Sequence, residues 1–373
     1  MNHVLENKLN LFMKKRKIKN ILVITGQKSF NFTGFKKLEI YRKFKSKMTI
    51  LYKKNEIPEI QELEYLIKKI NIINPDLIIA LGGGCVIDYA KLANGLYNIK
   101  NLRKKIKSST LKINSKKTKI LAIPTTAGSG AEVTKFSVIY IDKIKYSVEH
   151  NLLKPDFFSL IPKLVLNSPK IVRSSSGFDT IAQASESIFS KKANILSLKY
   201  SSKSLRFSIK SYLEFVNRPN LKNAAQMLKA ANFSGMAINI ARTNAPHALS
   251  YFFSSKLKIP HGIAVSIFFV EIINSYYQYT RKVKNKNLCK KFKFLFNSTN
   301  IKNIKNFNTL FAKFFYESGI DKYLNGILPR VNLKKKLKFH YNLDRLKNSP
   351  FQINKEFINN LLISKKFHFI ELF

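Results

Sequence analysis

The chain has 373 residues, of which 45% are hydrophobic and 12% aromatic; this length favours two domains, and the apolar content excludes a largely disordered chain. The formal net charge of +46 would suit nucleic-acid binding, but the lysines are spread along the whole chain and no nucleic-acid-binding motif accompanies them. We therefore expect no specific nucleic-acid partner and ascribe the charge to a compositional bias toward Lys, Asn and Ile.

The first residues of the chain do not form a recognisable secretory signal. Residues 1–20 lack an apolar core followed by a small-residue cleavage site. No apolar run reaches the roughly 18 residues that are needed to cross a bilayer. The two cysteines, Cys85 and Cys289, stand in different contexts and do not suggest a disulfide framework. We expect a cytoplasmic protein without a membrane partner.

Short apolar runs alternate with helical patterns through the first half of the chain. Strands are predicted at residues 21–26, 48–52, 76–81 and 119–126, with helices at residues 60–73 and about 86–97. Residues 136–150 have the pattern of a β-hairpin that turns near Asp142 and Lys143. This order predicts a Rossmann-like α/β domain with a parallel sheet over residues 1–169.

Two loops rich in small residues follow the third and fourth of the strands named above. Gly82, Gly83 and Gly84 stand between a strand and a helix, where glycine lets the backbone approach a phosphate and the helix start adds partial positive charge. The second loop supplies three hydroxyl groups, those of Thr125, Thr126 and Ser129. Because the carboxyl ends of parallel strands meet at one edge of a sheet, the loops predict a site for phosphate or sugar oxygens, although their spacing is not G-x-G-x-x-G.

Several other residues lie near these loops in the sequence. Asp88 and Lys91 are on the first turns of the following helix, within reach of the loop backbone or of a ligand. Thr134 and Glu132 would either orient a ligand or brace the second loop. Cys85 is interpreted as a small residue that is tolerated in the tight turn.

From about residue 170 the pattern changes to long stretches with apolar residues at helical spacing. We predict an all-α domain over residues 170–373. It includes a Lys/Asn-rich, solvated helix–loop surface at residues 280–305 and an amphipathic final helix at residues 353–367.

Four polar residues of this second half stand in apolar helical sequence. Asp179 and Gln183 are four residues apart and share a helix face, and His247 and His261 follow later, with Pro260 marking a break before the second histidine. Burial of such groups is costly unless something binds them. One carboxylate, one amide oxygen and two imidazoles suit Fe(II) or Zn(II), with positions left open for a substrate.

These segments, in this order, resemble motifs of the iron-containing (group III) alcohol dehydrogenases. GGGCVIDYAK is similar to the family's GGGSxxDxAK loop, with Cys85 in place of Ser, and IPTTAGSGAEVT is similar to its PTTAGTGSEVT loop. GFDTIAQASES, HALSY and IPHG resemble the segments that carry the metal ligands. The resemblance implies a dehydroquinate-synthase-like fold, NAD(P)-linked conversion of an alcohol and an aldehyde, and a metal held by Asp179, Gln183, His247 and His261.

The chain departs from the family pattern at three positions. Gln183 stands where most members have a histidine ligand, and Tyr251 replaces a further histidine four residues after the third ligand. Gly26 replaces an acidic residue that often ends the first strand, and Lys28 and Ser29 follow it. Loss of this acid removes a repulsion against a 2′-phosphate, so the cofactor is NADH or NADPH.

TGQKSF and ARTNAPHALSY also resemble a subgroup that is associated with phosphonoacetaldehyde reductases. Arg242, five residues before the third ligand, would either face a phosphonate or be a surface cation. The resemblance implies that the cofactor lies across the two loops and gives its hydride to a small anionic or polar aldehyde, which the metal polarises. Tyr251 or water would supply the proton. A homodimer is also expected.

Three other interpretations stay open on the sequence. Another enzyme of the same fold, such as a dehydroquinate synthase or a polyol-phosphate dehydrogenase, would use a different ligand set. A decayed enzyme would have lost its metal, with Gln183 as a trace of that loss. A basic protein without catalytic activity would bind DNA in a strongly salt-dependent manner.

Overall fold

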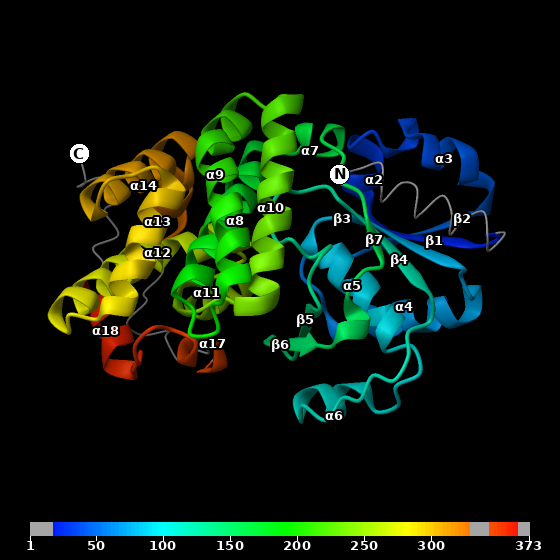
Figure 1. The fold of residues 1–373 in the computed structure, drawn as a ribbon. Helices are drawn as coiled ribbons and strands as arrows, with labels where there is room; N and C mark the ends of the chain where they lie inside the picture. The colour runs from blue at the N-terminus through cyan, green and yellow to red at the C-terminus, as the bar shows by residue number, and fades with distance from the viewer. Residues whose placement is uncertain (1–17, 329–342, 365–373) are drawn as a thin grey trace. The chain divides into compact units, whose positions relative to one another are not determined.

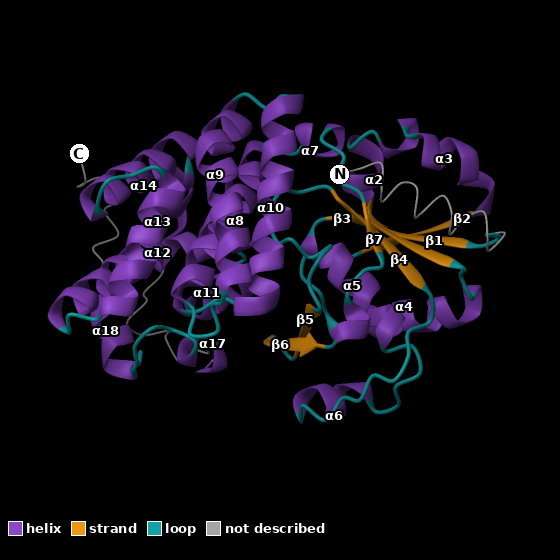
Figure 2. Ribbon diagram, viewed as in Figure 1, coloured by secondary structure: helices purple, strands orange, loops and turns teal. Residues whose placement is uncertain are grey.

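A computed structural model describes residues 18–328 and 343–364, which divide into two compact units. The first unit ends at Ser168 and the second begins at Pro169. The first combines a parallel sheet with helices, whereas every regular element described in the second is a helix (Figure 2). The predicted order of an α/β domain followed by an all-α domain is therefore confirmed.

The sheet of the first unit has five parallel strands in the order β2-β1-β3-β4-β7. They are β1 (Ile21–Gly26), β2 (Met48–Lys53), β3 (Leu77–Gly82), β4 (Lys119–Pro124) and β7 (Phe157–Phe158) (Figure 1). The first four are the predicted strands, with ends moved by at most two residues. The fifth has only two residues, which is too short to show a periodic pattern in the sequence.

Apolar clusters lie on both faces of this sheet, which explains the nearly continuous apolar runs of its strands. Ile24 faces the cluster that includes α4 (Ile60–Ile73) and α5 (Gly84–Gly95), and its neighbour Val23 faces the cluster that includes α2 (Gln27–Phe32). The helix α5 begins two residues earlier than predicted, so its first turn starts inside the glycine loop.

A two-stranded antiparallel hairpin of β5 (Phe136–Ile141) and β6 (Ile144–Glu149) stands apart from the five-stranded sheet. Asp142 and Lys143 form its turn with φ of 51° and 64°, as a twisted two-residue hairpin turn requires, so this prediction is confirmed. The remaining elements of the unit are short: α3 (Glu39–Phe44), α6 (Leu102–Lys107), α7 (Lys163–Leu166), η1 (Phe35–Lys37), η2 (Lys45–Lys47) and η3 (Asn151–Leu153).

The second unit is built around α8 (Lys170–Phe189), whose residues 177–189 are all buried. It packs against α9 (Ile195–Asn217), α10 (Leu221–Ala241) and α12 (His261–Lys282). The other helices described are α11 (Ala245–Lys256), α13 (Lys286–Thr299), α14 (Ile304–Ser318), α15 (Ile320–Ile327), α17 (Leu343–Lys347) and α18 (Lys355–Ser364). Across the described residues, no helix is both long and apolar enough to cross a membrane.

Asparagine is the N-cap residue of six of the described helices in this unit. In each case its side chain accepts a hydrogen bond from a backbone N–H of the first turn, which satisfies one of the donors that a helix start leaves without a partner. The six residues are Asn194, Asn220, Asn244, Asn285, Asn303 and Asn354, which begin α9, α10, α11, α13, α14 and α18. The Asn-rich composition therefore serves the helix boundaries.

Two predictions for the end of the chain need adjustment. The Lys/Asn-rich stretch that was expected to be solvated contains α13, and this helix buries Leu288, Phe292 and Leu295. Only the face of α13 that points away from these three buried residues corresponds to the predicted solvated surface. The final helix is present as α18, and the last residues of its predicted span, 365–367, lie outside the described residues.

Candidate active site

Three polar side chains follow one another along one face of α8. Asp179, Gln183 and Glu186 are spaced by four and then three residues, which brings them into line on a helix. All three are buried, with Glu186 fully so. The sequence predicts the first two as ligands. Glu186 is an additional member of the site, and its seven-residue spacing from Asp179 was a signal that could have indicated it.

Glu186 fixes the loop that leads into α11. Its Oε2 accepts from the backbone N–H of Asn244 at 2.8 Å, and its Oε1 lies 2.5 Å from Nδ1 of His247. Asn244 also donates from its side chain to the Glu186 carbonyl at 2.9 Å and accepts from the Tyr276 hydroxyl at 3.1 Å. An imidazole whose Nδ1–H donates to a carboxylate presents Nε2 as an acceptor, the form that binds metals.

The start of α12 lies unusually close to α8. The backbone N–H of Gly262 donates to the Ser175 hydroxyl at 3.0 Å. A Cβ atom on Gly262 would stand 1.8 Å from the Ser175 carbonyl oxygen and 3.0 Å from Cβ of Asp179. Only glycine permits this approach, which brings the preceding residue, His261, beside Asp179.

One ligand atom from each of Asp179, His247 and His261 lies within 4.8 Å of the other two. Nε2 of His247 is 3.1 Å from Oδ1 of Asp179, and the two imidazole centres are 5.4 Å apart. Ligands that bind one metal ion at about 2.0–2.2 Å stand roughly 3–3.5 Å from each other, so little movement is needed. This set of two histidines and a carboxylate fits Fe(II) or Zn(II).

The Gln183 amide has its nitrogen toward this set. Its Nε2 donates to Oδ2 of Asp179 at 2.9 Å, and its Oε1 accepts from the Ser234 hydroxyl at 3.1 Å. A half-turn of the amide would exchange the two atoms, and the Ser234 oxygen can then accept from Nε2 because its own hydroxyl donates to the Ala231 carbonyl. Gln183 can therefore serve as a ligand in this rotated orientation.

The two carboxylates around His247 decide its proton affinity. Burial lowers the pKa of His247, but Glu186 and Asp179 together outweigh burial and raise it above its ordinary value. A metal ion that binds Nε2 must displace the proton that this arrangement favours. We therefore expect metal binding to release a proton and to weaken as the pH falls.

Tyr251 lies on α11, the helix that carries His247, and Arg345 lies against its ring. Tyr251 follows His247 by four residues and is 7% exposed. The guanidinium carbon of Arg345, from α17, lies 5.8 Å from the centre of the Tyr251 ring, and its Nη1 donates to the Thr243 hydroxyl. Burial raises the pKa of Tyr251, and Arg345 opposes this. Arg242, the cation predicted from the sequence, is partly exposed and ends α10 with φ of 60°.

The glycine-rich loops of the first unit pack against each other. A Cβ atom on Gly83 would lie 3.3 Å from the Thr126 hydroxyl, and one on Gly84 would lie 2.7 Å from the Ser129 hydroxyl. Glycine at both positions therefore lets the two loops approach each other without displacing these hydroxyl groups. Desolvation raises the pKa of the adjacent Cys85 thiol to about 12, so the thiol stays protonated, as expected for a small filler of the turn.

Thr125 follows β4 and makes contacts with residues at or just after the ends of β3 and β1. Its backbone N–H donates to the Gly82 carbonyl at 3.1 Å, and its hydroxyl lies 3.5 Å from that of Ser29. The carboxyl ends of β1, β3 and β4 therefore lie at one edge of the sheet, as predicted. Eight of the predicted cofactor-binding residues belong to this edge: Gly26, Lys28, Gly82, Gly83, Gly84, Thr125, Thr126 and Ser129.

Two family models match the chain in succession. The model for "Iron-containing alcohol dehydrogenase" matches residues 4–162, and that for "Fe-containing alcohol dehydrogenase family, C-terminal" matches residues 173–336. The chain belongs to the iron-containing alcohol dehydrogenase family.

Curated relatives in this family match over part of their length. The chain is 29% identical over 233 residues to an alcohol dehydrogenase of Thermococcus barophilus and 26% identical over 226 residues to a 4-hydroxybutyrate dehydrogenase of Clostridium kluyveri. The aligned parts are 60% and 59% of this chain, and they are 61% and 60% of the relatives, less than two thirds of either.

Solved structures share the fold over nearly the whole chain. An iron-containing alcohol dehydrogenase of Thermococcus thioreducens has a TM-score of 0.82 at 22% identity, covering 95% of this chain and 94% of that one. A sulfoacetaldehyde reductase of Bifidobacterium kashiwanohense in complex with NAD+ has a TM-score of 0.78 at 20% identity, covering 95% and 93%.

In this family member, three of the predicted cofactor residues contact protein atoms. The buried ammonium of Lys91 donates to the carbonyls of Ala131 at 3.2 Å and Phe136 at 2.6 Å and to the Thr134 hydroxyl at 3.1 Å. One oxygen of Asp88 lies 3.7 Å from this ammonium. Burial lowers the pKa of Lys91 to about 8 although Asp88 opposes the shift. These contacts favour bracing of the second loop over direct contact with a ligand.

The end of β1 in this family member has room for a side chain. A Cβ atom on Gly26 would make only ordinary contacts, 3.6 Å from the Ser29 hydroxyl and 3.7 Å from Cε of Lys53. Lys53 ends β2 and pairs in register with Gly26, and Lys28 is exposed on the first turn of α2. Packing therefore does not impose glycine here, and the Lys53 side chain lies beside the position.

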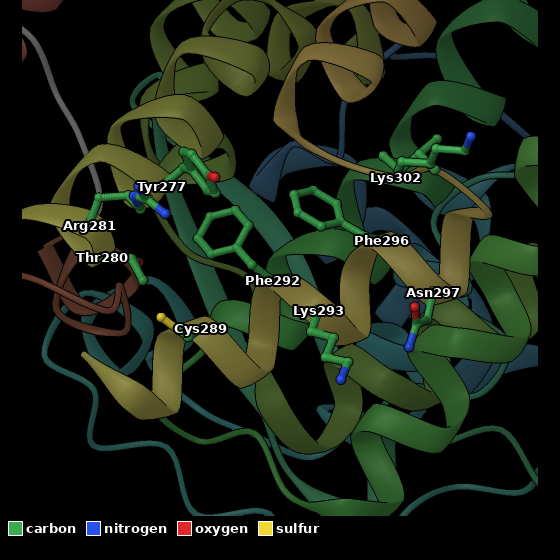
Figure 3. Close-up of a pocket in the computed structure, with 10 residues that line it drawn as sticks. Tyr277, Thr280, Arg281, Cys289, Phe292, Lys293, Phe296, Asn297 and Lys302 are labelled. Carbon is green, nitrogen blue, oxygen red and sulfur yellow. The ribbon is translucent and has the colours of Figure 1, made fainter. Parts of the chain in front are cut away.

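A groove between α12 and α13 of this family member is a separate feature (Figure 3). It has a volume of about 540 Å³, and Tyr277, Phe292 and Phe296 form its aromatic part, with Arg281 beside them. None of its lining residues is a histidine or a carboxylate, and Cys289 alone among them is a common metal ligand, so the groove offers no set of metal ligands. Tyr277 follows His261 on α12 by about 24 Å of helix length, which separates the groove from the ligand set.

Proposed function

We propose that this protein reduces small anionic aldehydes to alcohols with NADH or NADPH and a divalent metal ion, Fe(II) or Zn(II). The observation that carries this proposal is the convergence of Asp179, His247 and His261 in a buried site, with His247 oriented by Glu186. Metal enzymes orient a histidine ligand by a carboxylate at one ring nitrogen, as Glu186 does here, which leaves Nε2 to bind a metal together with Asp179.

The names of two relatives support an acidic substrate. Both 4-hydroxybutyrate and sulfoacetaldehyde carry an acid group in addition to the hydroxyl or aldehyde. Phosphonoacetaldehyde, which the sequence resemblance indicates, is a third molecule of this kind. We therefore propose an aldehyde with a carboxylate, sulfonate or phosphonate group, and we name phosphonoacetaldehyde as a specific candidate.

Different residues of the second unit would hold the metal and supply the proton. Asp179, His247, His261 and a rotated Gln183 would hold the metal, which when bound supplies a Lewis acid for the carbonyl oxygen. The nicotinamide hydride adds to the carbonyl carbon and a proton adds to the oxygen, so aldehyde, NAD(P)H and a proton become alcohol and NAD(P)+. Tyr251 would hold that proton at neutral pH as an ordinary phenol does, and burial raises its pKa further.

Cations at the end of β1 support NADPH as a cofactor. Lys53 and Lys28 would attract a 2′-phosphate, and Gly26 presents no acid to repel it. Gly26→Asp is expected to lower the ratio of kcat/KM for NADPH to that for NADH by about tenfold or more, because one repulsive charge contact costs about 1.4 kcal/mol or more. An unchanged ratio would place the 2′-phosphate elsewhere.

The function is tested with protein that has been purified anaerobically. Oxidation of NADH and NADPH would be followed with a panel of aldehydes, phosphonoacetaldehyde included, after addition of Fe(II) or Zn(II). His261→Ala should lose both bound metal and turnover, and full retention of both would contradict the proposal. A wild-type protein that neither binds metal nor turns over would support the decayed-enzyme interpretation.

We also propose that the protein is a homodimer. Light scattering on the purified protein would give its mass in solution, and a monomer at micromolar concentration would contradict this assignment. The activity assays at several protein concentrations would then show whether turnover depends on assembly.

A further inference from the structure

We infer that Arg345 is the residue that binds the acid group of the substrate, beside the metal ligands of the second unit. This inference rests on the proposed reduction of anionic aldehydes and names the side chain that would select them. Arg345 belongs to α17 and is remote in sequence from every proposed metal ligand, so only the folded chain brings it to this place.

The guanidinium group lies against the helix that carries a metal ligand. Its central carbon is 5.8 Å from the ring centre of Tyr251, and Tyr251 follows His247 by one turn of α11. Side chains four residues apart share one face of a helix, with Cβ atoms about 5–6 Å apart. The cation therefore contacts a side chain on the face of α11 that also carries His247.

The loop that positions His247 also positions Arg345. Nη1 of Arg345 donates to the Thr243 hydroxyl, and the next residue, Asn244, is the N-cap of α11. Asn348, three residues after Arg345, donates from its side chain to the Thr243 carbonyl at 3.0 Å. Arg345 is therefore hydrogen-bonded to the residue that precedes the N-cap of the helix that carries His247.

A guanidinium in this position suits an oxyanion. Its N–H groups form a planar fork that matches two oxygens of one carboxylate, sulfonate or phosphonate. Arg345 is partly exposed, but its neighbours Tyr251 and Thr243 are buried. Water therefore screens an ion pair at this place less than a pair on the open surface. A neutral aldehyde of the same length would lack this interaction.

Kinetics with matched aldehydes test the inference. In Arg345→Met, the KM for succinic semialdehyde should rise about 10- to 100-fold at nearly constant kcat, because a charge-assisted hydrogen bond is lost, while both constants for butanal stay within about twofold. Arg345→Lys keeps the charge but not the fork and should recover part of the KM. Arg206→Met removes an exposed arginine of α9 and should change kcat and KM for neither substrate.

Binding of succinate gives a readout that does not depend on turnover. Calorimetry should show a dissociation constant for succinate that is about tenfold higher in Arg345→Met than in the wild-type protein. If Arg345→Met lowered kcat/KM equally for succinic semialdehyde and butanal, Arg345 would only hold Thr243 and Tyr251 in place. This result would overturn the inference. A larger effect of Arg242→Met than of Arg345→Met would overturn it as well, since the acid group would then bind Arg242.

The proposed function and this inference fail in different ways. A wild-type protein that reduces neither aldehyde with either nicotinamide cofactor contradicts the function, while the succinate measurement still decides the role of Arg345. A wild-type protein that reduces butanal and has no preference for succinic semialdehyde retains the function and contradicts the inference.

Discussion

Glu186 is bonded to the site through both its side chain and its backbone. The carboxylate contacts His247 and the backbone N–H of Asn244, and the carbonyl accepts from the Asn244 side chain. The residue is fully buried, so the imidazole N–H and the amide compensate a charge that water does not reach. Removal of that charge would free His247 to adopt the other tautomer or to turn away from the ligand set.

We expect Glu186→Gln to weaken metal binding by about 10- to 100-fold while the chain still folds, because the amide keeps the shape of the carboxylate. Competition with a chromogenic chelator would measure the affinity. Glu317→Gln, at an exposed ion pair with Lys313 on α14, is the matched control and should have no effect. Equal affinities of Glu186→Gln and the wild-type protein would show that His247 is oriented by other means.

Gln183 provides a second test of the ligand set. Gln183→His replaces a weak amide donor by an imidazole and should raise metal affinity by about tenfold. Gln183→Leu has no atom that can bind the metal, so it should lower the affinity. The same chelator competition measures both variants. If Gln183→Leu binds metal as tightly as the wild-type protein, Gln183 is not a ligand.

At the scale of elements, Lys91 joins α5 to the segment that follows the second glycine-rich loop. Its pKa is lowered to about 8 from 10.5 by burial, so the folded chain binds fewer protons than the unfolded chain between these two pH values. The free energy of unfolding should therefore increase with pH across this interval. Below pH 8 the cost of burying the charged lysine is fully present, and above pH 10.5 it is absent.

The comparison with Lys91→Met isolates this contribution, because the other titrating groups are common to both proteins. Between pH 7 and pH 10 the stability of the wild-type protein should improve relative to the variant by about 2 kcal/mol. Denaturant unfolding at several pH values would measure the difference. A difference that stays constant with pH would mean that Lys91 keeps an ordinary pKa in the folded chain.

The close packing of α12 on α8 gives another prediction for elements. Gly262→Ala would force a Cβ atom onto the Ser175 carbonyl, so the helices must separate, and we expect a loss of about 3 kcal/mol in the free energy of unfolding. Gly326→Ala is the control, because its Cβ atom would meet nothing within 4 Å and alanine favours a helix by about 1 kcal/mol. Denaturant unfolding should thus shift in opposite directions for the two variants. Equal shifts would contradict the helix packing described here.

At the scale of the whole molecule, the sequence predicted the features that depend on hydrophobic periodicity and residue spacing, namely helices and the side chains that share a helix face. The helical pattern of residues 60–73 coincides with α4, and the four-residue spacing of Asp179 and Gln183 placed both on one buried helix face. The contact of Arg345 with Tyr251 joins segments that no local pattern relates. For Lys91 the sequence left contact with the loop backbone or with a ligand open, and only the structure gives its partners, Ala131 and Phe136.

The net charge of +46 leads to a prediction for the whole molecule. A strongly positive field attracts anionic substrates, and salt screens it. We expect kcat/KM for an anionic aldehyde to fall several-fold when salt is raised from about 0.05 M to about 0.5 M, with little change for butanal. Steady-state assays across this range would measure the effect. Parallel responses of the two aldehydes would show that the field does not act on the substrate.

The asparagine caps of the second unit have a consequence for chemical ageing. Asn194, Asn220, Asn285 and Asn303 each accept a backbone hydrogen bond through a side-chain oxygen, and aspartate caps a helix equally well. Spontaneous deamidation to aspartate at these four positions would preserve each helix start and add a negative charge that the helix N-terminus favours. Asn244 differs, since its amide nitrogen donates to the Glu186 carbonyl, and its deamidation would disturb the ligand site.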